Sequence, residues 1–362
     1  PRLVLYVTAH GYGHGVRTCD VLRAFRRRHP ETPVTVVSDL PASFFRSRLP
    51  DEEIDLRQDA FDLGLVQRDA LRADLEATLE RLAALRRGAR RREAKERGYL
   101  RAAHAGLVVA DIPGLPLRAA ADLGLPAYGV GNFTWDWIYE PWIERDDRWR
   151  AVVDWFRGDY AAADGVFRLP FCGDMSAFRH GEDVPLLTEP AASRREEIAA
   201  AGGIPADERW VLVGFTSLTW NEDALQRLNA LPHTHFLVLS PADFPGPAFH
   251  RIDRTQFSFS DALASCDIVL SKPGYGIVSE CVAGRRRLVY AEREDFRETP
   301  FLVEGIRRNL ASEPVSIEAL YRGDVGPALD AVSRRPVPEP IVPLGGAERL
   351  ADRYADILGG AL

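Results

Sequence analysis

The stretch from Asp267 to Gly284 constrains the fold more than any other part of the sequence. Its first residues, 267–271, form a short apolar run of the kind that makes a buried strand, and Gly274 and Gly276 lie in the turn that follows. Apolar residues then recur at helical spacing. A helix that begins directly after a strand gathers backbone N–H groups at the positive end of its dipole. The stretch therefore predicts an α/β unit whose turn binds an anion such as a diphosphate.

The residues around this turn are candidates for binding a nucleotide. Glycine lets a ligand approach the backbone because no Cβ intervenes. Glu280 lies one turn into the expected helix, where its carboxylate is able to accept hydrogen bonds from ribose hydroxyls. An ordinary strand–helix connection also contains glycines, so the glycines alone do not decide between the two. The candidate nucleotide-binding residues are Gly274, Tyr275, Gly276, Ser279 and Glu280, with Thr216 and Ser217 after an earlier strand and Glu298 after a later one.

Three of these candidates have a structural alternative that explains them equally well. At the turn that contains Thr216, a plain helix N-cap by Ser217 or Thr219 accounts for the hydroxyl side chains. Glu298 is able to hold sugar hydroxyls or to cap the helix expected to begin near Thr299.

The N-terminal turn carries two histidines. Residues 2–8 and 33–38 are apolar runs, and a glycine-rich turn with a helical pattern connects them, which predicts a βαβ unit. A backbone cradle for phosphate needs no imidazole, whereas histidine is able to move a proton near neutral pH. His14 lies between two glycines at the carboxyl end of the first strand, where open α/β sheets bind their ligands, and we interpret it as a catalytic base. For His10, a structural hydrogen bond and a function remain equally open.

A tryptophan-rich segment follows the strand expected at 126–131. Five of the seven tryptophans lie between Trp135 and Trp155. Core packing and stacking on sugar rings explain them equally well. Asp136 and Asp111, which both follow expected strands, are candidates to orient His14. The expected acceptor or phosphate side comprises His10, Gly11, Gly13, Arg17, Asn132 and Trp135.

The remaining pattern predicts two α/β domains. A chain of 362 residues is long enough for two domains. We expect one domain over 1–185, a second over 186–345, and a C-terminal helix at 346–362 that packs back on the first. A continuous helical pattern is expected over 66–103, and the stretch 170–191 is expected to be a linker. The expected strands are 2–8, 33–38, 106–112, 126–131 and 165–169 in the first half, and 209–215, 235–239, 267–271 and 287–291 in the second.

Composition excludes several classes of protein. A formal net charge of −7 argues against a generic binder of nucleic acid or anionic membranes. The four cysteines are scattered, so neither a disulfide framework nor a zinc site is expected. No signal peptide and no apolar run of about 20 residues is present, which favours a cytoplasmic, bacterial-type protein. The sequence contains no Asp-x-Asp, the usual carboxylate clamp of metal-dependent sugar transfer, so we expect no metal and no cofactor.

Several stretches together resemble one known family. They are Val4–Val16 with its Ala-His-Gly-Tyr-Gly-His turn, the Asn-Phe-Thr-Trp-Asp-Trp-Ile-Tyr block at 132–139, Arg-Leu-Pro at 168–170, Lys-Pro-Gly-Tyr-Gly-Ile-Val-Ser-Glu at 272–280, and Glu-Thr-Pro-Phe-Leu at 298–302. They resemble the glycosyltransferase-like N-terminal domain of plant-type L-arabinokinases and its stand-alone bacterial relatives, which belong to the GT-B class. More distantly, the chain is similar to the N-acetylglucosaminyltransferase that completes lipid II and to the nucleotide-sugar hydrolase of pseudaminic acid synthesis, in which the histidine matching His14 is catalytic.

The resemblance implies a division of labour between the domains. It puts the nucleotide on the second domain, at Gly274, Gly276 and Glu280, and the base and acceptor on the first, at His14. The phosphate-binding loop of the sugar-kinase half is absent from the sequence, so kinase activity is not implied. Where relatives carry a glycine pair, this sequence has Gly214 followed by Phe215, which puts that contact in doubt.

We therefore expect a GT-B fold, an α/β arrangement of two doubly wound Rossmann-like domains that face each other across a cleft. The expected activity is metal-independent, inverting transfer of a sugar from a nucleotide-sugar donor to a small-molecule or glycan acceptor. His14 would deprotonate the acceptor, oriented by Asp111 or Asp136. The alternatives are a nucleotide-sugar hydrolase, with water as the acceptor, and a non-catalytic nucleotide-sugar sensor.

Overall fold

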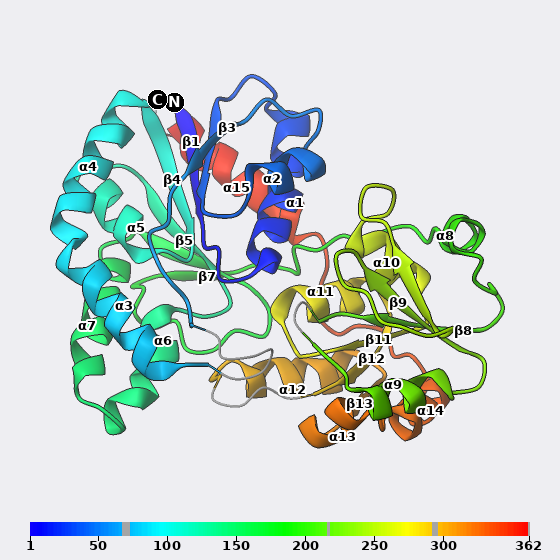
Figure 1. Cartoon of the computed structure of the whole chain (residues 1–362). Coiled ribbons are helices and arrows are strands. Elements are labelled where there is room, and N and C mark those ends of the chain that lie inside the picture. The colour runs from blue at the N-terminus through cyan, green and yellow to red at the C-terminus, as the bar shows by residue number, and fades with distance from the viewer. Residues whose placement is uncertain (67–72, 216–217, 292–295, 361–362) are drawn as a thin grey trace. The chain divides into compact units, whose positions relative to one another are not determined.

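The computed structural model describes residues 1–66, 73–215, 218–291 and 296–360, which form two compact units (Figure 1). Unit 1 comprises 1–66, 73–188 and 343–360, and unit 2 spans Glu189–Val342. The expected boundaries, after residues 185 and 345, each differ by three residues from the observed boundaries after 188 and 342.

Unit 1 is built around one parallel sheet. Its elements are β1 (Arg2–Val7), α1 (Tyr12–Arg28), β2 (Val34–Ser38), α2 (Ala42–Arg48), β3 (Asp55–Gln58), α3 (Leu75–Arg87), α4 (Ala89–Ala102), β4 (Ala105–Asp111), α5 (Gly114–Ala121), β5 (Ala127–Gly131), α6 (Trp135–Tyr139), the 3₁₀ helix η1 (Glu140–Glu144), α7 (Arg148–Tyr160), β6 (Gly165–Arg168), β7 (Gly181–Asp183) and α15 (Gly346–Gly360). Within the described residues, the sheet order is β3-β2-β1-β4-β5-β6-β7. The two central strands, β1 and β4, are buried almost throughout, as their continuous apolar runs require.

The strand order reverses between β1 and β4. From β1 the chain moves outward to β2 and β3, and then returns to β4 on the other side of β1. This is the doubly wound arrangement, in which ligands bind outside the carboxyl ends of the strands at the point of reversal. The turn after β1 and the last residue of β4, Asp111, both lie at that point.

Unit 1 differs from the expectation in its helical stretch and in its edge strands β3 and β7. The helical pattern over 66–103 is broken, because α3 ends and α4 begins at Gly88, which is the cap residue of both helices. Residues 67–72 of that pattern lie outside the described part of the chain. The strand at 165–169 is not the last of its sheet, since β7 lies within the stretch expected to be a linker. β7 has only three residues, Gly-Glu-Asp, and therefore lacks an apolar pattern.

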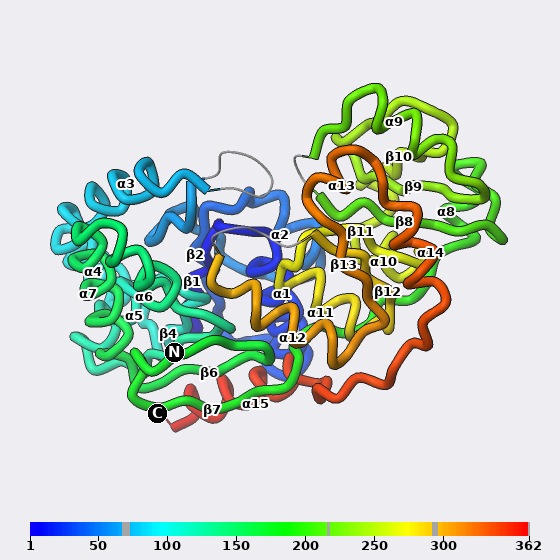
Figure 2. The backbone as a smooth tube through the Cα atoms, turned by 90° about the horizontal axis from the view of Figure 1, so that it is seen from below, coloured from blue at the N-terminus to red at the C-terminus, as the bar shows by residue number. Residues whose placement is uncertain are grey.

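The helix α15 packs against α1 within unit 1 (Figure 2). Leu350 and Tyr354 bury their side chains, while Arg27 and Arg28 of α1 form exposed ion pairs with Glu348 of α15. Exposed ion pairs contribute little to stability, so the buried apolar face accounts for most of the attachment.

Unit 2 repeats the doubly wound plan. Its elements are α8 (Arg195–Gly202), β8 (Arg209–Val213), α9 (Glu222–Asn229), β9 (Thr234–Leu239), β10 (Phe249–Ile252), α10 (Phe259–Ser265), β11 (Ile268–Ser271), α11 (Tyr275–Gly284), β12 (Arg287–Tyr290), α12 (Thr299–Asn309), β13 (Ser312–Pro314), α13 (Ile317–Arg322) and α14 (Gly326–Arg334). The described strands pair in the order β10-β9-β8-β11-β12-β13, all in parallel, and the order reverses between β8 and β11.

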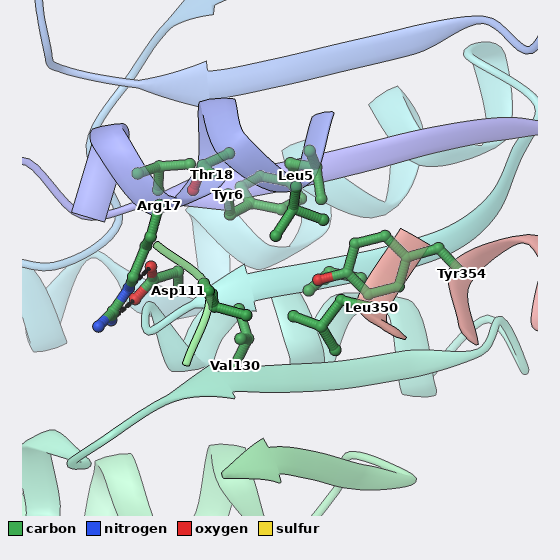
Figure 3. A pocket seen from close by; sticks show the side chains of 12 residues that line it. Leu5, Tyr6, Arg17, Thr18, Asp111, Val130, Leu350 and Tyr354 are labelled. Carbon is green, nitrogen blue, oxygen red and sulfur yellow. Dashed lines mark hydrogen bonds and ion pairs between the residues drawn. The ribbon is translucent and has the colours of Figure 1, made fainter. Parts of the chain in front are cut away.

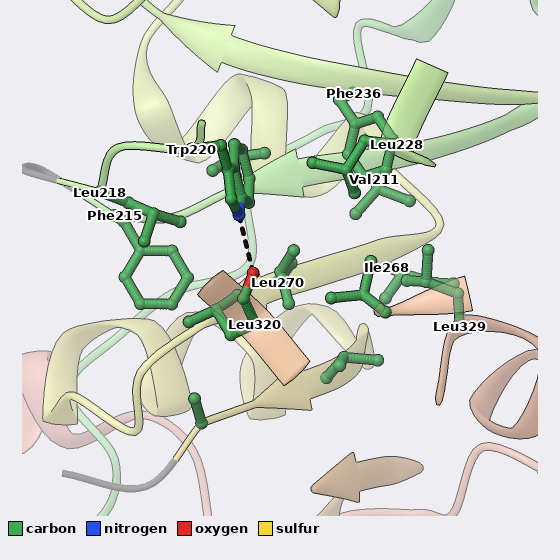
Figure 4. Packing of buried hydrophobic residues seen from close by; sticks show 14 of the residues in the cluster. Val211, Phe215, Leu218, Trp220, Leu228, Phe236, Ile268, Leu270, Leu320 and Leu329 are labelled. Carbon is green, nitrogen blue, oxygen red and sulfur yellow. Dashed lines mark hydrogen bonds between the residues drawn. The ribbon is translucent and has the colours of Figure 1, made fainter. Parts of the chain in front are cut away.

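An apolar core fixes the helices of unit 2 against its sheet (Figure 4). Trp220 is buried in this core, and its indole Nε1–H donates to the carbonyl of Leu320 (2.7 Å), as the dashed line in Figure 4 shows. This hydrogen bond satisfies the one polar atom of a large buried side chain. The prediction of two doubly wound α/β units is confirmed.

Candidate active site

His14 lies in the first turn of α1, directly after the carboxyl end of β1, and its side chain is largely buried. Its Nδ1 atom is 2.8 Å from Oδ1 of Asp111, the last residue of β4. The ring of Phe133 packs edge-to-face against the imidazole, with ring centroids 5.9 Å apart. Residues at or just after the ends of three neighbouring strands, β1, β4 and β5, thus form one cluster at the carboxyl edge of the sheet.

Nδ1 of His14 contacts both Oδ1 of Asp111 (2.8 Å) and Nη2 of Arg17 (2.9 Å). With the proton on Nδ1, the ring donates to the Asp111 carboxylate and Nε2 keeps its lone pair. With the proton on Nε2, Nδ1 accepts a hydrogen bond from Arg17 instead.

A buried arginine holds Asp111 in its charged form. The Nε–H of Arg17 donates to Asp111 Oδ2 (2.6 Å), Nη2 donates to Oδ1, and Nη1 donates to Oδ1 of Asn132 (3.1 Å). Burial by itself raises the pKa of Asp111, but Arg17 and His14 outweigh it and bring the pKa to about 2. Burial also lowers the pKa of His14, and this effect exceeds the opposing pull of Asp111. The imidazole is therefore neutral near pH 7.

Residues of the C-terminal helix α15 share a small cavity with the cluster (Figure 3). Arg17, Thr18 and Asp111 line a cavity of about 10 Å³ together with Leu350 and Tyr354 of α15. Figure 3 shows Arg17 and Asp111 pointing toward one another, with Leu350 and Tyr354 projecting from α15. A cavity of this size holds about one water molecule. The cavity lies beside the Arg17–Asp111 pair and is too small for a substrate.

A further buried carboxylate, Asp62, lies beside Thr8 and Trp135 and was not among the predicted site residues. It accepts hydrogen bonds from the Thr8 hydroxyl (2.9 Å) and from the Trp135 indole N–H (2.7 Å). Burial raises its pKa to about 6, and the charge of Asp111 adds to this effect. Asp62 lies in an irregular segment after β3 and belongs to no motif, so no signal in the sequence singled it out.

His10 lies beside the same group. Its ring packs edge-to-face on Trp135 with centroids 5.2 Å apart, and its Nδ1 lies 3.4 Å from the backbone N–H of Leu65. Gly64 has a positive φ of 68°, and a Cβ there would clash with the imidazole of His10. Gly11 is the N-cap residue of α1, and Gly13 is the second residue of that helix. His10 therefore has defined structural contacts with the Trp135 ring and with the backbone at 64–65.

The tryptophans form core rather than an open sugar platform. Trp135, Trp137, Trp142 and Trp149 are all buried. Trp135 stacks on Tyr139 with centroids 5.4 Å apart, and Trp142 packs on Trp149 at 4.8 Å. The helical spacing of these tryptophans therefore reflects their packing in the core.

Asp136 does not orient His14. Its Oδ2 lies 3.5 Å from Nε of Arg157 on α7. Of the two carboxylates that the sequence offered, the structure brings Asp111 to the histidine. The reason is the parallel pairing of β1 with β4, in which Val7 is the partner of Asp111.

In unit 2, the turn between β11 and α11 has the expected form. Gly274 is the N-cap residue of α11 and has no side chain with which to cap the first turn of this helix. Backbone N–H groups at the start of a helix suit an anion. Among the described residues, a Cβ added to Gly274 would meet no atom within 4 Å. The Ser271 hydroxyl donates to the carbonyl of Gly214 (2.9 Å) and connects this turn with the one after β8.

Of the other candidate nucleotide-binding residues, four lie on α11, one precedes α12 and two lie outside the described residues. Tyr275, Ser279 and Glu280 lie on α11 and are mostly buried, and Gly276 is the second residue of that helix. Glu298 is the N-cap residue of α12 but makes no capping hydrogen bond with its side chain. Thr216 and Ser217 lie outside the described residues. The helix after them is capped by Asn221, whose side chain accepts from the N–H of Ala224, so neither Ser217 nor Thr219 is its cap.

Three further observations concern the described part of the chain only. No group of three or more His, Cys, Asp or Glu side chains there is arranged to hold a metal ion. No helix within those residues has the length and apolarity needed to span a membrane. The four cysteines are free thiols.

The sequence was compared with protein families and with curated proteins. No family model matches the sequence. The chain is 31% identical over 346 residues to L-arabinokinase of Arabidopsis thaliana, an alignment that covers 88% of this chain and 32% of the relative. The chain thus spans about a third of the length of the curated relative it matches.

The solved structures that resemble the chain cover it almost completely. The glycosyltransferase of kitacinnamycin matches with a TM-score of 0.63 at 16% identity, over 99% of this chain and 97% of that one. The calicheamicin glycosyltransferase CalG4 matches with a TM-score of 0.62 at 16% identity, over 99% and 98%. UGT89C1 of Arabidopsis thaliana, solved with UDP-L-rhamnose, matches with a TM-score of 0.61 at 15% identity, over 100% and 98%. With its two doubly wound units and these matches, the chain has the GT-B fold.

Proposed function

We propose that the protein transfers a sugar from a nucleotide-sugar donor to an acceptor hydroxyl, with His14 as the general base. The observation that carries this proposal is the 2.8 Å contact between Nδ1 of His14 and Asp111. In the proposed tautomer Nδ1 donates to Asp111, and Nε2 of the neutral imidazole is able to take a proton. Several structures that resemble the chain were solved with UDP or a UDP-sugar, which supports a donor of this class.

The proposed reaction is a single displacement. Nε2 of His14 takes the proton of the acceptor hydroxyl, whose oxygen attacks the anomeric carbon while the bond from that carbon to the diphosphate breaks. Attack from the side opposite the leaving group inverts the anomeric centre. Asp111 stabilises the imidazolium that forms, and Arg17 keeps Asp111 charged throughout.

The leaving group has its own proposed site on unit 2. Negative charge grows on the departing diphosphate, and the backbone N–H groups at the start of α11 are suited to receive it. Glu280 is the proposed partner of the ribose hydroxyls. In this scheme no metal is needed to neutralise the diphosphate, because the backbone dipole of α11 does so.

A donor screen tests the proposal. UDP-sugars come first, followed by donors that carry other bases, each incubated with the protein in the presence and absence of candidate sugar and small-molecule acceptors. The expected result is slow donor consumption in water and faster consumption with one acceptor class, detected by mass spectrometry as a new glycoside. Fast release of free sugar in water alone would identify a hydrolase, and binding without turnover of any donor would identify a sensor.

A further inference from the structure

Unit 1 contains a second, larger pocket that none of His14, Asp111 and Arg17 lines. Its volume is about 370 Å³, within the range of about 300–1,000 Å³ found for small-molecule sites. It is formed by α6, η1, α7 and the segment between β6 and β7. The residues that line it are Asp136, Trp137, Glu140, Arg157, Ala161, Asp174, Ser176, Ala177 and Arg179.

The charged groups of this pocket are held in place by one another. Arg157 donates through Nη2 to Oε1 of Glu140 (3.0 Å), and its Nε lies 3.5 Å from Oδ2 of Asp136. Asp174 accepts hydrogen bonds from the backbone N–H (2.8 Å) and the hydroxyl (2.9 Å) of Ser176. A ligand therefore meets polar groups that are already oriented.

Asp136 is the most buried of the three carboxylates in the lining, with 4% of the residue exposed. Its Oδ1 is enclosed by protein atoms and has no well-formed hydrogen bond among the described residues. Its Oδ2 lies 3.5 Å from Nε of Arg157.

The mixture of charges points to a neutral ligand. An anion would approach three carboxylates, Asp136, Glu140 and Asp174, and a cation would approach the guanidinium groups of Arg157 and Arg179. A hydroxyl group, in contrast, is able to donate to a carboxylate and to accept from a guanidinium. A molecule with several hydroxyl groups uses both kinds of side chain at once.

Trp137 shapes one wall of the pocket. Its indole packs directly against Gly173, where an added Cβ would come within 2.4 Å of the ring, so this position of the indole requires a glycine. The small side chains of Ala161 and Ala177 leave room for a molecule that carries several hydroxyl groups.

We propose that this pocket binds a neutral saccharide. The site is separate from the His14 cluster in its lining residues, and its existence does not depend on the proposed transfer reaction.

Equilibrium binding tests the inference on the full chain. The probes are methyl glycosides of common pentoses and hexoses and neutral disaccharides, with inorganic phosphate and tetramethylammonium as charged comparisons, followed by calorimetry and ligand-observed NMR. We expect saturable binding of at least one neutral glycoside and none of phosphate or tetramethylammonium. Failure of every glycoside to bind, or saturable binding of either charged probe in this pocket, would overturn the inference.

Variants locate the binding. Arg179→Ala removes an exposed lining side chain and should fold normally, and Asp136→Asn keeps the shape of the buried carboxylate. Each should weaken the glycoside about tenfold, as expected for the loss of a hydrogen bond that involves a charged group. Arg150→Ala, on the same helix as Arg157 but outside the lining, is the control and should leave affinity unchanged. Unchanged affinity in Arg179→Ala and in a folded Asp136→Asn would place the sugar elsewhere and refute the proposal.

Discussion

Nδ1 of His14 lies 2.8 Å from Oδ1 of Asp111, a residue 97 positions further along the chain. The contact follows from the register of the sheet, because Val7 pairs with Asp111 and the N–H of Thr8 donates to the Asp111 carbonyl (2.7 Å). Arg17, one turn after His14, clamps the same carboxylate. His14 and Asp111 are therefore fixed by regular secondary structure, which positions side chains more accurately than loops do.

The first prediction removes the proposed base. His14→Ala should lower turnover by about 10²–10⁴-fold, the usual contribution of a positioned acid–base group. Nucleotide affinity should change little, since the proposed nucleotide contacts lie on unit 2. Steady-state kinetics and calorimetry with the nucleotide measure the two effects separately. His29→Ala, at the other end of α1, is the control. Full turnover in His14→Ala would assign His14 a purely structural role.

The second prediction concerns the pH dependence of turnover. Burial lowers the pKa of His14 below its ordinary value of 6.5, with Asp111 opposing this shift in part. A base works in its unprotonated form, so a lowered pKa extends activity to more acidic pH. The acid limb of kcat/KM against pH should therefore have its midpoint below 6.5. A midpoint above 6.5 would show that Asp111 dominates the titration of His14, or that another group is the base.

The third prediction compares two arginines on the same helix. Arg17→Met leaves the buried carboxylate of Asp111 without its guanidinium partner and should lower the free energy of unfolding by about 3–5 kcal/mol. Arg27→Met breaks only an exposed ion pair with Glu348, so its effect should stay within about 1 kcal/mol. Urea unfolding at pH 7 measures both. Equal losses would mean that Arg17 contributes packing alone.

How far the sequence predicts this fold depends on where each strand lies in its sheet. The central strands were predictable, because a strand covered on both faces must be apolar along its length. The strands that were not anticipated, β3, β7, β10 and β13, are the edge strands of the two sheets. Their short sequences, such as Gly-Glu-Asp in β7 and Ser-Glu-Pro in β13, carry no continuous apolar run. An edge strand pairs on one side only and is under weaker demands on composition.

In the candidate site, too, local motifs could be predicted, whereas contacts that depend on long-range strand pairing could not. A histidine in a glycine turn after the first strand was visible as a candidate base. Asp111 and Asp136 could not be separated, since both follow strands that end at the same edge of the sheet, and only the pairing of β1 with β4 selects Asp111. Asp62 was missed because it follows β3, an edge strand that the pattern did not indicate. Register and edge strands depend on long-range pairing, which local periodicity does not contain.

The fourth prediction uses the unusual titration of Asp62. Burial raises its pKa from 3.8 to about 6, so the folded protein holds a proton that the unfolded chain has lost between these values. Stability contributed by this group is therefore present below pH 3.8 and falls as pH rises toward 6. Asp62→Asn removes the titration, so its stability relative to the wild type should rise by about 3 kcal/mol between pH 3.5 and pH 7. Urea unfolding at the two pH values checks this, and a constant difference would show that Asp62 titrates normally.

The fifth prediction addresses the nucleotide site and its charge. Glu280→Ala should weaken nucleotide binding by about 1.5–3 kcal/mol, the range for a hydrogen bond to a charged group. Glu280 is buried, so Glu280→Gln, which keeps the shape of the side chain, should accompany the alanine variant. Because the first turn of α11 is the proposed partner of the diphosphate, turnover of the best donor should also persist in excess EDTA. Unchanged nucleotide affinity in both folded variants would remove Glu280 from the site. Complete loss of turnover on chelation, restored by magnesium or manganese, would show that a cation and not the helix N-terminus carries the phosphate chemistry.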